Sequence, residues 1–135
     1  MDDQQFLEAF ESAELHPFRH ADHIRMAWLY LRRDGWEIGY HRISDGLRHF
    51  AESHGARQKY HETTTRFWAY VVNYAIALAE DVDDFDAFSA RYPHLFDGRI
   101  IFKHYNEAII QSTTARLEWI EPDLRPLPAT AIRGE

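Results

Sequence analysis

Two stretches of the sequence open an expected helix with histidine. In FRHADHIRMAWLYL, His20 and His23 stand three residues apart at the first turn, and in KYHETTTRFW His61 takes the same place. Residues three apart on a helix lie close enough to share one ligand. Neutral imidazole is a common ligand of transition metals, which need three or four convergent donors. The spacing therefore raises the hypothesis of a metal site, against the simpler alternative of helix capping and a polar surface.

Helical periodicity places these histidines on the inward sides of their helices. Because a helix advances about 100° per residue, His20 falls on the same side as Ile24 and Leu31, with His23 beside them. His61 falls on the apolar side of its own helix in the same way. Three imidazoles buried without partners would be costly, so the pattern favours a shared polar site.

The helix between these two carries further histidines with different orientations. His41 and His49 fall on the outward side, so we expect them to be solvated. His54 is in phase with the apolar side and stands at the helix end. It could support the site, or it could be a cation that interacts with the C-terminal helix dipole.

The apolar pattern predicts an all-α fold, a bundle of five or six helices in a single domain of residues 1–135. The short apolar runs RIIF and LEWI could instead be strands. The proline-rich residues 117–135 predict an extended tail on the surface. The expected helices cover residues 2–12, 20–34, 36–54, 61–80, 85–90 and 97–111.

The connections between the helices predict where these residues meet. Short connections make consecutive helices antiparallel. The N-termini of helices 20–34 and 61–80 should therefore lie at the same end of the bundle as the C-terminus of helix 36–54. The last long helix should run back to this end. It would then bring Ser112 and Arg116 near the histidines.

The predicted site is a centre with a divalent transition metal, zinc or non-haem iron, held by the three histidines. Glu62 would be a further ligand or a general base that acts on metal-bound water or on a substrate. Arg116 would pair with this carboxylate or bind an anionic group of the substrate, or it could be only a surface arginine that anchors the tail. Tyr60, Thr65 and His54 would support the ligands by hydrogen bonding.

Composition excludes several other functions. The formal net charge of −7 makes nucleic acid an improbable partner, and the absence of cysteine excludes disulfides and thiolate chemistry. No apolar run is long enough to span a membrane, and the acidic N-terminus does not resemble a signal peptide, so we expect a cytoplasmic protein. Leu29 and Tyr70, expected on exposed sides, hint at a homodimer.

Three motifs together resemble a family of small bacterial all-helical proteins, with F-x-H-x-x-H, YHE-T-x-T and AR…PDL…LP. The chain carries them as FRHADH, YHETTT and ARLEWIEPDLRPLP. The resemblance implies a helical fold but no particular reaction, and His54 is outside its motifs. The positions that it marks are Phe18, His20, His23, Tyr60, His61, Glu62, Thr63, Thr65 and Arg116.

The sequence leaves two hypotheses of function. The first is a metal-dependent enzyme, or a metal-binding protein, that acts on a small molecule at one end of the bundle. The second is a non-catalytic helical module, in which the histidines form a buried structural network and function lies in protein association.

Overall fold

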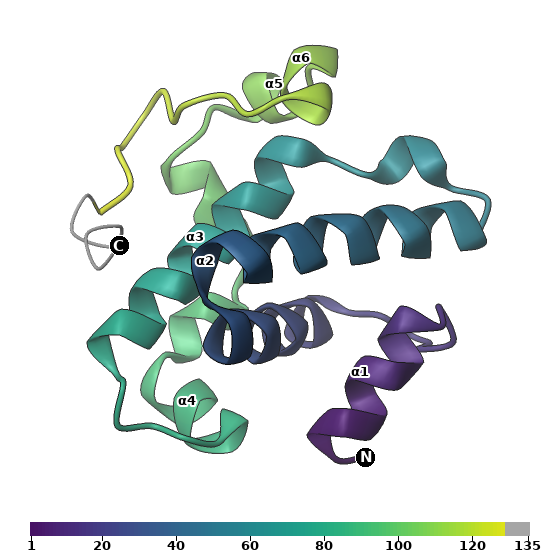
Figure 1. The fold of residues 1–135 in the computed structure, drawn as a ribbon. Helices are drawn as coiled ribbons and strands as arrows, with labels where there is room; N and C mark the ends of the chain where they lie inside the picture. The colour runs from purple at the N-terminus through teal and green to yellow at the C-terminus, as the bar shows by residue number, and fades with distance from the viewer. Residues whose placement is uncertain (129–135) are drawn as a thin grey trace.

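The computed structural model describes residues 1–128, and every regular element in this range is helical (Figure 1). The prediction of an all-α fold is therefore confirmed for this part of the chain, where neither RIIF nor LEWI forms a strand. No helix among these residues is long and apolar enough to cross a membrane. In chain order the elements are α1 (Asp3–Glu11), α2 (His20–Ser53), η1 (Arg57–Lys59), α3 (Glu62–Leu78), α4 (Phe85–Arg91), η2 (Pro93–Phe96), η3 (Gly98–Lys103), α5 (Glu107–Ile110) and α6 (Thr113–Leu117), where η marks a 3₁₀-helix.

Element α2 consists of two helices joined by a sharp kink at Gly35. This residue has φ 80° and ψ −178°, a conformation that residues with a side chain rarely adopt. The sequence correctly placed a helix end here. After the kink the second half of α2 lies back along the first (Figure 1). At Gly39 a Cβ atom would lie only 3.0 Å from the Tyr30 carbonyl oxygen, so the two halves pack closely.

One cluster of buried side chains joins the elements from Phe6 in α1 to Tyr105 after η3. α1 packs against the second half of α2, where the ring of Phe10 would lie 2.6 Å from a Cβ atom at Gly46. The predicted inward residues of α2 are buried as expected, with Ile24 fully enclosed. This core fixes the relative positions of α2 and α3, which carry the histidines.

The single helix predicted over residues 97–111 is wrong. The structure has η3, α5 and α6 in and beyond this region instead. The side chains of Asp97, Asn106 and Ser112 each accept a hydrogen bond from a backbone N–H two or three residues later. Such side chains cap the start of a new helix, so each one favours a restart over continuation. α5 and α6 nevertheless lie beside the start of α3, as the prediction required (Figure 1).

The C-terminal segment after α6 forms no helix up to Pro128, and it is anchored to α3 by side chains. The Thr63 hydroxyl donates to the Glu118 carbonyl at 2.8 Å and accepts from the Ile120 N–H at 3.1 Å. The Tyr70 hydroxyl donates to the Pro128 carbonyl at 2.8 Å. The remainder of the predicted tail, residues 129–135, lies outside the described residues.

Leu29 and Tyr70 are not exposed, contrary to the prediction. Leu29 packs against the core cluster, and Tyr70 is partly buried beside Trp36 and the C-terminal segment. Both side chains therefore have partners within the chain. The homodimer that they suggested stays a prediction without these residues to support it.

Candidate functional site

Three segments that the sequence predicted to meet do line one pocket of about 320 Å³. They are the start of α2, its C-terminal part, and the chain from η1 into α3. The structure thus brings the three predicted histidines together with Tyr60 and Thr65. We call this the histidine pocket, and its lining residues are Phe18, Arg19, His20, His23, Leu47, Phe50, Ala51, Lys59, Tyr60, His61, Thr64 and Thr65.

His61 uses both ring nitrogens to hold the backbone. It is the N-cap of α3, where its Nδ1 accepts a hydrogen bond from the Thr64 N–H at 3.0 Å. Since Nδ1 accepts, Nε2 carries the proton, and it donates to the Ile110 carbonyl at 2.7 Å. His61 therefore joins the start of α3 to α5, and it has no lone pair left for another ligand.

His20 uses one of its two ring nitrogens in a hydrogen bond. Its Nε2–H donates to the Leu95 carbonyl at 2.9 Å, which ties the start of α2 to η2. The ring also packs on Trp68, with centroids 4.4 Å apart. Only Nδ1 remains available to the pocket.

His23 is the exception among the three. Its ring packs edge-on against Phe18, with centroids 5.3 Å apart, and neither ring nitrogen has a hydrogen-bond partner within residues 1–128. Burial, and then the nearby charge of His20, lower the pKa of His23 to about 4. At neutral pH the ring is therefore uncharged. It offers one N–H donor and one acceptor nitrogen.

The His23 nitrogens are also within reach of a ligand. Within residues 1–128, Arg25 Nε is the only fully buried side-chain nitrogen or oxygen that has no hydrogen-bond partner. The unpaired nitrogens of His23 are therefore not fully enclosed by the protein, and the residue lines the pocket.

These donors do not fit the predicted three-histidine metal site. Zinc needs at least three protein ligands, whereas the arrangement leaves free nitrogens only on His20 and His23. No group of three or more His, Asp or Glu side chains within residues 1–128 is placed to hold an ion. Zinc or iron binding stays a prediction, and it would require His61 to release Thr64 or Ile110.

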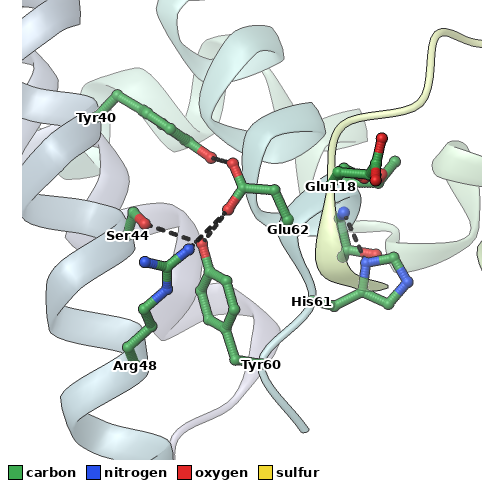
Figure 2. A network of polar contacts seen from close by, with 9 residues as sticks. Tyr40, Ser44, Arg48, Tyr60, His61, Glu62 and Glu118 are labelled. Atoms are coloured by element: carbon green, nitrogen blue, oxygen red, sulfur yellow. Dashed lines mark hydrogen bonds and ion pairs between the residues drawn. The ribbon is translucent and has the colours of Figure 1, made fainter. Parts of the chain in front are cut away.

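Glu62 does not line the histidine pocket; its side chain points away from His61 into a separate polar network (Figure 2). Its carboxylate accepts hydrogen bonds from the hydroxyls of Tyr40 and Tyr60, each at 2.7 Å. Arg48 adds a third contact at 3.3 Å, and Ser44 lies 3.0 Å from the Tyr60 hydroxyl. A carboxylate with these partners joins α2 to α3 and holds Tyr60 in place. The structure gives it no contact with the predicted metal ligands.

Both tyrosines of this network stay protonated. Burial, followed by the hydrogen bond to Glu62, raises the pKa of Tyr40. Burial is also the main reason that the pKa of Tyr60 is raised, although its contact with Ser44 opposes the change. Each phenol is therefore a stable donor to Glu62.

His54 is an exposed residue outside the histidine pocket. Its Nε2–H donates to the Ala13 carbonyl at 3.0 Å, and its ring stacks on Phe50 with centroids 4.5 Å apart. It connects the end of α2 to the loop after α1. His41 and His49 are exposed, as helical phase predicted.

Arg116 lines a second pocket, of about 560 Å³, together with Arg48, Arg57 and Tyr60. Tyr60 lies between the two pockets, because it lines both. Arg116 does not pair with Glu62, which is held by Arg48 instead. Its nearness to Tyr60 agrees with the predicted return of the chain to this end.

Some functional residues had a signal in the sequence that periodicity could reveal. Tyr40, Ser44 and Arg48 recur every four residues, which places a polar stripe along one side of α2. The partners of the histidines had no such signal. The carbonyls of Leu95 and Ile110 belong to the backbone, and any residue type would supply them.

The sequence matches no protein-family model, and no curated protein or solved structure is significantly similar to it. The resemblance to small bacterial helical proteins therefore stays a prediction.

Proposed function

We propose that the protein binds a small organic molecule in the histidine pocket and that His23 supplies the polar contact. The proposal rests on one observation, that the His23 side chain lacks a hydrogen-bond partner among the described residues. His20 and His61 donate to backbone carbonyls, whereas the neutral ring of His23 has no hydrogen-bond partner in the described chain and lines the pocket. A ligand with a suitable polar atom would satisfy a group that the fold leaves unpaired.

The walls of the pocket indicate the class of ligand. Phe18, Leu47, Phe50 and Ala51 supply apolar surface, and the volume of about 320 Å³ lies at the small end of the range for ligand pockets. A neutral imidazole does not require a charged partner. The ligand that fits is small and mainly apolar, and its hydroxyl or N–H group donates to His23.

A pair of matched probes tests the proposal. Phenol and toluene have similar size, but only phenol donates a hydrogen bond. We expect phenol to shift the amide signals of pocket residues in ¹H–¹⁵N NMR spectra and to bind about tenfold more weakly to His23→Leu, the effect of losing roughly one hydrogen bond. Toluene should bind both proteins with similar affinity.

The control for this experiment is His49→Leu, at an exposed position outside both pockets. It should leave the affinity for phenol unchanged. The proposal fails if phenol does not perturb the pocket, or if His23→Leu weakens phenol and toluene equally, since that pattern would report damage to the pocket rather than a lost hydrogen bond.

The predicted metalloenzyme is tested on the same variants. Elemental analysis of protein purified without a histidine tag should distinguish the two functions. Stoichiometric zinc or iron in the wild type, lost in His23→Leu with the fold intact, would replace our proposal with the metal site. The structural-module hypothesis gains support if neither metal nor small molecule binds.

A further inference from the structure

We infer that the second pocket is a binding site for a phosphoryl group. It opens beside the histidine pocket and is lined by one arginine from each of three elements. Arg48 comes from α2, Arg57 from η1 and Arg116 from α6. The chain has a formal net charge of −7, whereas three guanidinium groups around one hollow make this part of the surface locally positive. We call this hollow the arginine pocket.

The three arginines differ in the contacts that their side chains make. The acidic side chains nearby do not neutralise all three positive charges. Arg48 lies over the ring of Tyr60, at 4.6 Å from its centroid, and contacts Glu62 at 3.3 Å. Arg57 is 84% exposed and has one distant contact with Glu52, at 3.8 Å. The guanidinium group of Arg116 has no hydrogen bond or ion pair among the residues that the structure describes.

Among the lining residues within 1–128, Glu52 is the only acidic one, against three cations. Glu62 neutralises Arg48 from outside the lining, and Glu52 reaches Arg57 only weakly. The charge of Arg116 therefore remains for a ligand. An anion in this pocket would meet at least one full positive charge, with Arg57 free to turn toward it.

The arrangement of the arginines favours phosphate over carboxylate. A guanidinium group donates two parallel hydrogen bonds to an oxyanion, and Arg48, Arg57 and Arg116 approach the hollow from separate elements. A carboxylate is planar and has two oxygens, so it matches one such fork. A tetrahedral phosphoryl group presents oxygens in several directions and can be held by more than one arginine at once.

This site is independent of the proposed function. The arginine pocket shares only Tyr60 with the histidine pocket, and its charge argument does not involve His23. Either site can therefore fail its test while the other stands.

Isothermal titration with pyrophosphate, at fixed ionic strength, tests the inference. We expect saturable binding to one site, and about tenfold weaker binding to Arg116→Gln, because one charged hydrogen-bonding group is lost. Arg99→Gln is the matched control. It removes the same charge from an exposed residue outside the pocket, and it should change the affinity by less than about twofold, since salt screens distant charges.

Three results would overturn the inference. These are no saturable binding of pyrophosphate, an equal loss in Arg99→Gln, and tighter binding of citrate than of pyrophosphate, which would indicate a carboxylate ligand. Circular dichroism checks that each variant is folded. If Arg116→Gln does not fold, Arg57→Gln takes its place with the same expected loss, since its exposed side chain contributes little to packing.

Discussion

Three histidines share one pocket, yet their nitrogens hold different partners. His20 and His61 donate to backbone carbonyls 75 and 49 residues further along the chain, whereas His23 has no such partner in the described residues. Helical phase correctly placed all three on inward sides, because phase depends only on spacing. It could not distinguish them, since the carbonyls of Leu95 and Ile110 reach the pocket through the tertiary fold.

The lowered pKa of His23 predicts how stability depends on pH. The folded pKa is about 4, against 6.5 for an unperturbed histidine. Between these values the unfolded chain binds a proton at His23 that the folded protein does not bind. The contribution of His23 to stability is therefore complete above pH 6.5 and is lost as the pH drops toward 4. The loss attributable to this residue is up to about 3 kcal/mol.

Urea unfolding between pH 7.5 and pH 4 measures this effect. The wild type should lose more stability over the range than His23→Leu, because the variant has no imidazole to protonate. His49→Leu, at an exposed site, should follow the wild type. An identical loss in His23→Leu and the wild type would show that the titration of His23 is not responsible.

At the scale of elements, capping residues decided which predictions succeeded. Gly35 ends the first half of α2. A glycine in the sequence predicts such a helix end, because few other residues tolerate a positive φ. The predicted helix over residues 97–111 failed at Asn106 and Ser112. These residues are tolerated within helices on propensity alone, but here their side chains cap new ones. The local sequence allowed both outcomes, and in the structure α6 packs against α3.

Substitution of Gly35 tests the kink. We expect Gly35→Ala to destabilise the protein by about 1–3 kcal/mol, since alanine is strained at φ 80° and ψ −178°. The matched control is Gly98→Ala, where φ is not positive and a Cβ atom would meet nothing within 4 Å. Urea unfolding gives both values. Equal stability of the two variants would mean that the kink is not held in this conformation.

At the scale of the whole molecule, the fold brings distant segments to one end. The short connections predicted that the two histidine-bearing helix starts would meet, and the histidine pocket confirms it. The anchoring of the C-terminal segment was not predictable. It depends on Thr63, whose fully buried hydroxyl bonds to Glu118 and Ile120 across more than fifty residues.

Thr63→Val tests this connection. Valine has nearly the same shape but removes both hydrogen bonds, so the variant should lose about 1–3 kcal/mol of unfolding free energy. Hydrogen exchange at the Ile120 amide should become faster, because that N–H loses its acceptor. Thr114→Val, at an exposed position, should have little effect. Unchanged exchange at Ile120 would show that Thr63 does not anchor the segment.

The most direct test of the histidine pocket is the long-range ¹H–¹⁵N NMR spectrum of the histidine rings at pH 6, recorded with and without phenol. We predict a neutral His23 whose ring nitrogen shifts on titration, while His61 keeps its proton on Nε2 throughout. A His23 ring that is charged at this pH, or that does not respond to phenol, would contradict its role as the unpaired group that meets the ligand.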